Sequence, residues 1–250
     1  MALAGGVDES GRGCVVGPLV VAGVSADEEG VQELKEIGVR DSKALTPRRR
    51  SALYGQILKI SARAYWVHIQ PEEIDTVVMT GRKYRKLNYL EALYFAKVVD
   101  QLDAESVTVD ASDAVPARFR EVICSNLKAR CDISAFHKAD RDYPLVSAAS
   151  IIAKVERDRQ VERLRSAHGD FGSGYPSDPK TKIYFRRWLE EGRLPPAWTR
   201  RSWKSWRSNS PRDMRRATSL ASRSPIACFA FSTSVTTSPM PRTREAKRSG

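Results

Sequence analysis

Short apolar runs recur along the first two thirds of the chain and have the length and residue types of buried β-strands. The first two, "GGVDES" and "CVVGPLVVAGVSA", are predicted to be strands joined around Arg12 and Gly13. Three later runs are rich in β-branched or aromatic residues, and strands are predicted there as well: "AYWVHIQ" at 64–70, "SVTVDAS" at 106–112 and "CDISAFHKAD" at 131–140.

The stretches between these runs repeat apolar residues at helical spacing. They predict helices at 31–38, 46–63, 81–102, 115–129, 143–169 and 182–192. Thr46 is a good N-cap for the second of them, and Pro47 suits a first helical position. The helix at 143–169 is apolar almost all round in its first half, so its N-terminus is expected to point into the protein. Strands that alternate with helices predict an α/β layered fold with a mixed sheet.

Composition changes this picture at the end of the chain. Residues 207–250 hold nine serines and eight arginines with no sustained periodicity, which predicts a disordered tail. We therefore expect one domain over 1–206, with a helical C-terminal part, and a separate tail over 207–250. A terminus translated out of frame would have the same appearance as a native extension.

The chain carries a net charge of +12, of which the tail supplies +7. A basic balance favours a polyanionic partner, with nucleic acid first, although the remaining +5 is a weak signal by itself. No apolar run reaches the roughly 18 residues of a membrane span, and the first residues do not resemble a secretion signal. The four cysteines include no C-x-x-C pair, which argues against structural zinc. A cytoplasmic monomer is the expectation.

Four acidic residues end or follow predicted strands: Asp8, Glu9, Asp110 and Asp140. Any one of them could be an ordinary exposed acid. Strand ends of an α/β sheet converge on one edge, however, and carboxylates gathered there suit Mg²⁺ or Mn²⁺. Neighbours such as Asp8 and Glu9 face opposite sides of a regular strand, so they share a site only if the chain bends. Gly11 and Gly13 provide that freedom.

Several motifs occur in one order: "DESGRG", "DSKAL", "VDASD", "FHKADRDYPLVSAASIIAKVERDR", "FGSGYPSDP" and "RRSWK". In this order the chain resembles type 2 ribonuclease H, ribonuclease HII, and most of all its archaeal form. The resemblance runs from about residue 4 to Lys204. It departs at Ser10, where alanine is usual, and it fails after Ser205.

The resemblance implies a ribonuclease H-like fold, with a mixed central sheet flanked by helices. It also implies an endonuclease that cuts the RNA strand of RNA–DNA hybrids and incises 5′ to ribonucleotides embedded in DNA, leaving 3′-hydroxyl and 5′-phosphate ends. The family's metal ligands fall on the four acids already named. Two metal ions can activate water and stabilise the leaving oxygen of a phosphodiester.

The resemblance also assigns substrate-binding residues. Backbone groups of Gly11, Arg12 and Gly13 would contact the 2′-hydroxyl and the phosphate, with the Arg12 side chain meeting phosphate. Tyr175 would sense the 2′-hydroxyl, which distinguishes RNA from DNA. Lys43 is expected to contact a backbone phosphate, and a solvated lysine is the alternative.

Several alternatives stay open. Asp142 competes with Asp140 as the fourth ligand, or else caps the buried helix. Ser147 and Ser150 are expected to serve helix packing. A DNA-directed nuclease of the same fold and a non-catalytic basic nucleic-acid-binding module are the rival functions. Some relatives end in a sliding-clamp-binding motif that includes a glutamine, and residues 207–250 contain none.

Overall fold

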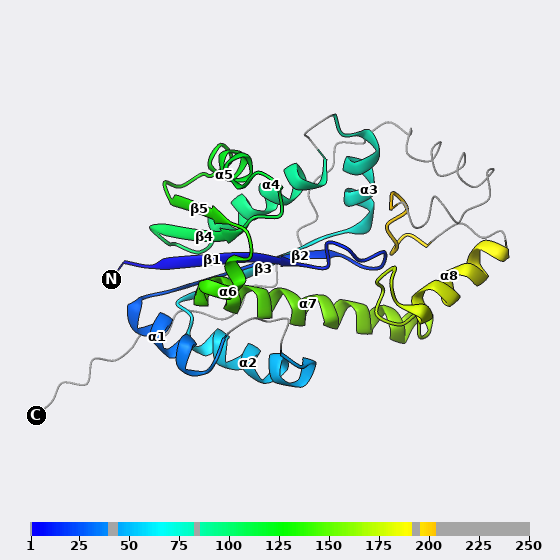
Figure 1. Ribbon diagram of the computed structural model, residues 1–250, viewed down its shortest axis with the longest axis horizontal. Helices are drawn as coiled ribbons and strands as arrows, with labels where there is room; N and C mark the ends of the chain where they lie inside the picture. Colours follow the sequence, from blue (N-terminus) through cyan, green and yellow to red (C-terminus); the bar gives the residue numbers. More distant parts are fainter. Residues whose placement is uncertain (1, 40–44, 83–85, 192–195, 204–250) are drawn as a thin grey trace, which may run out of the picture.

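Five strands form one mixed sheet in the computed structural model, which describes residues 2–39, 45–82, 86–191 and 196–203 (Figure 1). The strand order is β3-β2-β1-β4-β5. Their bounds are β1 Ala4–Ser10, β2 Leu19–Ala26, β3 Arg63–Ile69, β4 Ser106–Asp110 and β5 Asp132–Phe136. The β1/β2 and β2/β3 pairs are antiparallel, whereas β1/β4 and β4/β5 are parallel. The mixed sheet predicted from the sequence is confirmed.

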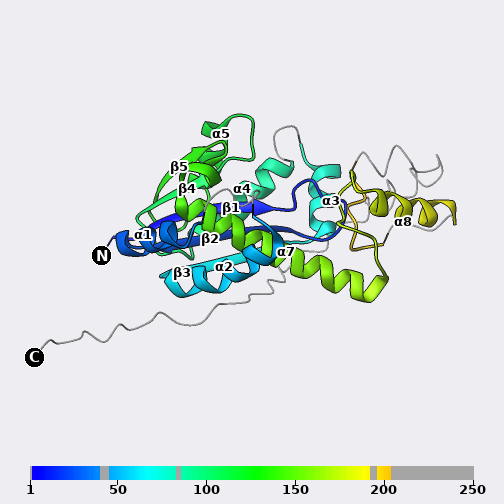
Figure 2. The ribbon, with the colours of Figure 1, turned by 60° about the horizontal axis from the view of Figure 1, so that its bottom comes forward.

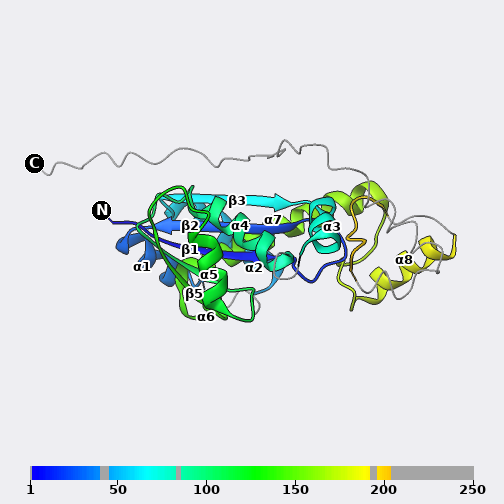
Figure 3. The same ribbon diagram turned by 90° about the horizontal axis from the view of Figure 1, so that it is seen from above.

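Helices cover both faces of this sheet and complete a three-layer fold (Figures 1 and 2). Helices α4 and α5 pack on one face, and α1, α2 and α7 pack on the other. Helix α8 lies beyond the end of the sheet where β1 leads into β2 (Figure 3). The helix bounds are α1 Glu28–Glu36, α2 Pro47–Ile60, α3 Pro71–Thr80, α4 Leu87–Val99, α5 Pro116–Cys124, α6 Ala139–Asp142, α7 Pro144–His168 and α8 Pro179–Glu190.

Helix α7 comes into direct backbone contact with the central strand β1. A Cβ atom built on Gly6 would lie 2.3 Å from the carbonyl carbon of Leu145 and from the nitrogen of Val146. No side chain fits in that space, so glycine allows the first turn of α7 to rest on β1. The first half of α7 is buried, as its all-round apolar pattern predicted.

The second predicted strand is shorter than expected. Residues 14–18 are not part of β2, which begins at Leu19. Gly17 has a φ of 74° and Pro18 lacks a backbone N–H, so the chain cannot continue the ladder there. The apolar side chains of this segment are buried all the same, because Val15 and Val16 join a small core with Phe171 and Phe185.

Other boundaries also differ from the prediction. The sequence analysis assigned no element to the residues of α3, and α4 begins at Leu87 rather than near residue 81. Strand β5 ends at Phe136, so Asp140 lies on α6 and not on a strand. The predicted cap is confirmed: the Thr46 hydroxyl accepts a hydrogen bond from the Arg49 backbone N–H at 3.3 Å. Among the described residues, no helix is both long and apolar enough to cross a membrane.

Candidate active site

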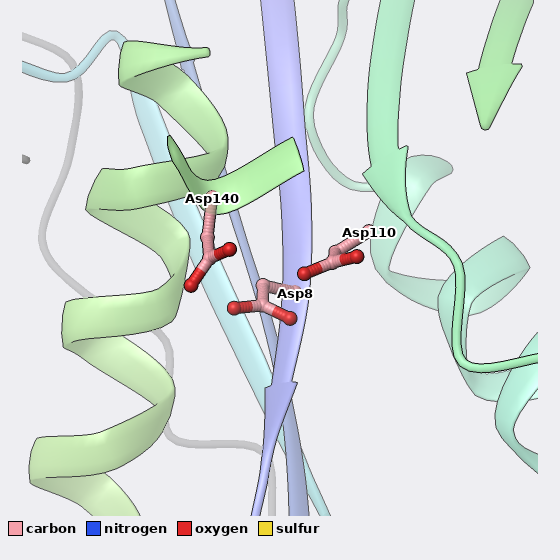
Figure 4. Close-up of side chains that lie close together, drawn as sticks. All are labelled: Asp8, Asp110 and Asp140. Atoms are coloured by element: carbon pink, nitrogen blue, oxygen red, sulfur yellow. The ribbon is translucent and has the colours of Figure 1, made fainter. Parts of the chain in front are cut away.

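Three aspartates from three different elements meet above the middle of the sheet (Figure 4). Asp8 lies on β1, Asp110 ends β4 and Asp140 lies on α6. One carboxylate oxygen of each lies within 4.8 Å of those of the other two. The structure therefore brings together three of the four acids that the sequence singled out.

The pairing of the parallel strands explains why two of these side chains are neighbours. Val7 of β1 is in register with Val109 of β4, so Asp8 and Asp110 follow at equivalent positions. The third aspartate arrives through a left-handed turn after β5, where Lys138 has a φ of 59° and a ψ of 33°. The Lys138 backbone N–H donates to Asp110 Oδ1 at 2.9 Å, which ties this turn to the end of β4.

Burial and mutual repulsion both disfavour the charged forms of these carboxyl groups. Burial, followed by the charges of Asp8 and Asp140, raises the pKa of Asp110 to about 6. Burial and the neighbouring Glu9 carboxylate raise the pKa of Asp8 well above its ordinary range, against a hydrogen bond with Ser150 that lowers it. Asp140 is completely buried.

This donor set fits a hard divalent cation. The three ligand atoms are all carboxylate oxygens, the type that Mg²⁺ and Mn²⁺ prefer. A bound cation would also offset the repulsion among three converging carboxylates. The arrangement thus has the chemistry of a metal site.

Glu9 stands apart from the three aspartates. It follows Asp8 directly in β1, and its carboxyl group feels the charges of Glu91 on α4 and of Asp110. Burial, then the charge of Glu91, and to a lesser degree that of Asp110, raise the pKa of Glu9 to about 7. The Asp8 and Glu9 carboxyl groups nevertheless share a hydrogen bond, so Glu9 borders the group without being one of its three members.

The Gly11–Gly13 turn leaves the end of β1 beside these acids. Gly11 has a φ of 93°, and its carbonyl accepts from the Cys14 N–H at 3.1 Å. The Arg12 guanidinium is directed at α4, where it forms a salt bridge with Glu91 and donates to Asn88 Oδ1 at 2.6 Å. Glu91 is completely buried, and burial raises its pKa to about 7 although Arg12 acts to lower it.

Tyr175 lies against the same turn. A Cβ atom on Gly13 would be 3.8 Å from the Tyr175 ring, and the Arg157 guanidinium stacks over that ring at 4.8 Å from its centroid. Arg157 Nη2 also donates to Cys14 Sγ at 3.0 Å and to the Ser173 carbonyl at 2.7 Å. Arg157 of α7 thus joins the Gly11–Gly13 turn to the loop that carries Tyr175.

Other predicted residues have different placements. Asp142 is exposed and is not a member of the aspartate group, and Tyr143 rather than Asp142 is the N-cap residue of α7. Lys43 lies outside the described residues. Ser147 and Ser150, expected to serve packing, contact the site, because Ser147 Oγ donates to the Asp140 carbonyl and Ser150 hydrogen-bonds Asp8.

Sequence reasoning missed three charged residues that hold the turn and the tyrosine loop: Glu91, Arg157 and Arg200. Arg200 is fully buried and donates to the Arg12 carbonyl at 2.9 Å. Glu91 did leave a signal, since it is the single charge in the apolar stretch "YLEALYF". A lone acid on an apolar helix face requires a buried cationic partner.

Comparison with known proteins gives one consistent family. The family model described as Ribonuclease HII matches residues 5–206. A ribonuclease HII of Pyrococcus horikoshii is 44% identical over 209 residues, which cover 81% of this chain and 90% of the relative. The ribonuclease HII of Pyrobaculum arsenaticum is 48% identical over 201 residues, covering 80% of this chain and 94% of the relative.

Solved structures agree with the sequence relatives. The crystal structure of ribonuclease H2 from Pyrococcus horikoshii OT3 superposes with a TM-score of 0.75 at 39% identity, covering 86% of this chain and 98% of that one. The ribonuclease HII of Archaeoglobus fulgidus, solved as a complex with PCNA, gives 0.72 at 40% identity, covering 85% and 96%. Bst-RNase HIII in complex with Mn²⁺ gives 0.69 at 20% identity and covers 88% and 70%, which shows a shared fold.

Proposed function

The chain belongs to the ribonuclease HII family, and from this premise we propose that its endonuclease activity incises duplex DNA 5′ to an embedded ribonucleotide. As a member of this family it is a metal-dependent endoribonuclease that cleaves the RNA strand of RNA–DNA hybrids. The proposed finer specificity concerns single ribonucleotides, and the proposed products carry 3′-hydroxyl and 5′-phosphate ends.

One observation supports this proposal more than any other: three buried or half-buried aspartates converge beside a glycine turn and an exposed tyrosine. A non-catalytic binding protein gains nothing from carboxylates at the place where phosphate must lie, because like charges repel. The charge of these acids is useful only where a cation offsets it. A metal-dependent cleavage site satisfies that condition.

In this proposal Asp8, Asp110 and Asp140 hold Mg²⁺ or Mn²⁺, and Glu9 supports them at the margin. Two such ions, when bound, would activate a water molecule and stabilise the leaving oxygen. The chain's own contribution is to fix the carboxylates through the β1/β4 register and the turn at Lys138. Ser147 and Ser150 of α7 hold the Asp140 backbone and the Asp8 carboxyl in place.

Recognition of the ribonucleotide is assigned to the turn and to the tyrosine. Backbone groups of Gly11, Arg12 and Gly13 approach the sugar and phosphate closely, since Gly13 has no side chain and is exposed. The Tyr175 hydroxyl is protonated near neutral pH, as an ordinary tyrosine is, and partial burial raises its pKa further, to about 12, so it can donate to a sugar oxygen. Lys43 is a further phosphate contact in this proposal. A single chain supplies the whole site, so we propose a monomer.

The test uses a DNA duplex with one embedded ribonucleotide, incubated with Mg²⁺, with Mn²⁺ and with excess chelator. We expect one cut, 5′ to the ribonucleotide, with either metal, and none in chelator. Asp140→Asn should lose most turnover, because it removes a buried carboxylate from the aspartate group. Asp142→Asn is the matched control and should keep full turnover, because Asp142 is exposed two residues away.

Three results would contradict the proposal. Equal cutting of an all-DNA duplex would favour the DNA-directed nuclease. Tight binding without cleavage in any metal would favour the non-catalytic module. Loss of activity in Asp142→Asn but not in Asp140→Asn would show that the aspartate group is not the metal site.

A further inference from the structure

Arg12, at the centre of the Gly11–Gly13 turn, is bound through both its side chain and its backbone carbonyl. The guanidinium of Arg12 is paired with Glu91 and Asn88, which lie one turn apart on α4. The backbone carbonyl of Arg12 accepts from Arg200 Nη1 at 2.9 Å. Only about a third of the Arg12 side chain, 32%, is exposed. Arg12 is therefore already committed to intramolecular partners.

The contact with Glu91 is costly to break. The Glu91 carboxylate is completely buried, and the same oxygen that faces Arg12 also accepts from the Ser112 hydroxyl at 2.8 Å. A buried carboxylate that loses its cationic partner keeps the full cost of desolvation. If the Arg12 side chain turned outward to a phosphate, Glu91 would lose its salt bridge and keep only the Ser112 hydroxyl and the charge of Arg200. The paired conformation is strongly favoured.

Asn88, one of the two α4 residues that bind the Arg12 guanidinium, is itself held in place by a hydrogen bond. Asn88 Nδ2 donates to Asp113 Oδ2 at 2.8 Å, which fixes the amide so that its oxygen faces Arg12. Asp113 in turn pairs with Arg118 of α5. Ser112 and Asp113 lie two and three residues after Asp110, so the partners of Arg12 on α4 and the aspartate group both contact the segment that follows β4.

We propose that Glu91 is a positioning residue that, through Arg12, fixes the Gly11–Gly13 backbone as a preformed reader of the 2′-hydroxyl. The inference rests on the proposed function and deepens it. Arg12 acts in this arrangement by anchoring the turn rather than by binding phosphate with its side chain. A reader whose backbone is already ordered loses little conformational entropy when it binds, and this favours selectivity.

The test compares binding to an RNA–DNA hybrid and to a DNA duplex of the same sequence, measured in chelator over a range of salt concentrations. Glu91→Gln keeps the shape of the side chain and removes its charge. We expect the preference for the hybrid to fall about tenfold or more, as for loss of a hydrogen bond to a charged group. With Mg²⁺ present, KM for the hybrid should rise more than kcat falls.

Two further variants sharpen the test. The double variant Arg12→Met with Glu91→Gln removes the buried pair together, so neither charge is left unpaired. We expect it to lose no more selectivity than Glu91→Gln alone and to keep the salt dependence of the unmodified chain. Glu156→Gln is the control, because Glu156 is also buried on a helix and paired with an arginine, Arg159, but not at this turn.

The outcomes separate the two proposals. If the unmodified chain shows neither hybrid preference nor cleavage, the proposed function fails and the inference falls with it. If the unmodified chain prefers the hybrid and Glu91→Gln preserves that preference, the inference alone is overturned. It is also overturned if Glu156→Gln loses as much selectivity, or if the double variant lowers the salt slope by the amount of about one phosphate contact.

Discussion

At the scale of single residues, the site is built from groups whose charges oppose folding. Asp8, Asp110 and Glu9 all have raised pKa values, and burial is the first cause in each case. A metal-free chain must either protonate these groups or accept their repulsion. A cation that binds here therefore gains part of its binding free energy by relieving the repulsion among the buried carboxylates.

The Asp110 carboxyl should make the metal-free chain less stable as pH rises. Its pKa in the folded chain is about 6, above the ordinary value of 3.8, so folding favours the protonated form. This contribution is fully present below the ordinary pKa and is lost as pH rises through about 6. In Asp110→Asn the side chain does not ionise, so raising the pH does not destabilise the folded chain through this position. In chelator, the variant should gain a few degrees of melting temperature over the unmodified chain between pH 4 and pH 7.

Asp113 offers a control of opposite sign three residues further on. Burial acts to raise its pKa, but hydrogen bonds with Arg118 and Asn88 outweigh that effect and lower it. Its contribution to stability is present above the ordinary pKa and is lost as pH falls. Asp113→Asn should therefore reduce the melting temperature at neutral pH and have less effect in acid. If the difference in melting temperature between Asp110→Asn and the unmodified chain did not change with pH, the raised pKa of Asp110 would be contradicted.

At the scale of elements, helix α7 organises the site. Its first turn rests on β1 at Gly6, its serines contact Asp8 and the Asp140 backbone, and Arg157 reaches the loop that carries Tyr175. One helix thus connects the aspartate group to the turn and to the tyrosine. The distance between these parts depends on how closely α7 lies against the sheet.

Gly6→Ala should disrupt this contact. The added methyl group would meet backbone atoms of Leu145 and Val146 at 2.3 Å, and backbone cannot rotate away as a side chain can. We expect a loss of about 1–3 kcal/mol in the free energy of unfolding, together with lower activity because α7 and the aspartates move apart. Urea unfolding and hybrid cleavage measure the two effects.

Gly55→Ala is the matched control on α2. A Cβ atom at Gly55 would meet nothing within 4 Å, and the residue lies inside a regular helix. The same substitution should there stabilise the chain by about 0.5–1 kcal/mol and leave cleavage unchanged. If Gly6→Ala behaves as Gly55→Ala does, the packing of α7 on β1 is looser than described.

At the scale of the whole molecule, the last described residues return to the site. Asp75 of α3 accepts hydrogen bonds from the backbone N–H groups of Arg201 and Ser202, at 2.8 and 2.9 Å. Arg200 reaches the carbonyl groups of Arg12 and Gly17. The segment around residue 200 therefore connects the turn after β1 to α3.

Truncation after Ser205 should preserve the fold and metal-dependent cleavage, because every contact just described remains. The removed residues carry +7 of the chain's net charge of +12, so nonspecific DNA binding at low salt should weaken. Truncation after Pro196 is the contrasting variant: it removes Arg200 and Ser202 and should lower the melting temperature. A large loss of melting temperature on truncation after Ser205 would place the domain boundary further along the chain.

Much of the fold was decided by local pattern. The apolar runs identified all five strands, and the helical spacing identified α2, α5 and α7 closely, because a strand or helix that buries one face must repeat apolar residues at its own period. The same pattern failed at residues 14–18, where an apolar run is buried as a loop. Burial selects apolar residues whatever the backbone conformation, so the period alone could not separate the two.

The site, too, was predicted from the sequence in part, and the remainder depended on the tertiary structure. Residue types and motif order singled out Asp8, Glu9, Asp110 and Asp140, with Asp142 as the alternative to Asp140, because hard cations prefer carboxylate ligands. Only tertiary structure showed that Glu9 lies outside the group of three aspartates, and that Glu91, Arg157 and Arg200 hold the recognition elements. Arg200 and its partner Arg12 are 188 residues apart in the sequence. A local sequence pattern cannot predict a contact between residues so far apart, because folding alone brings them together.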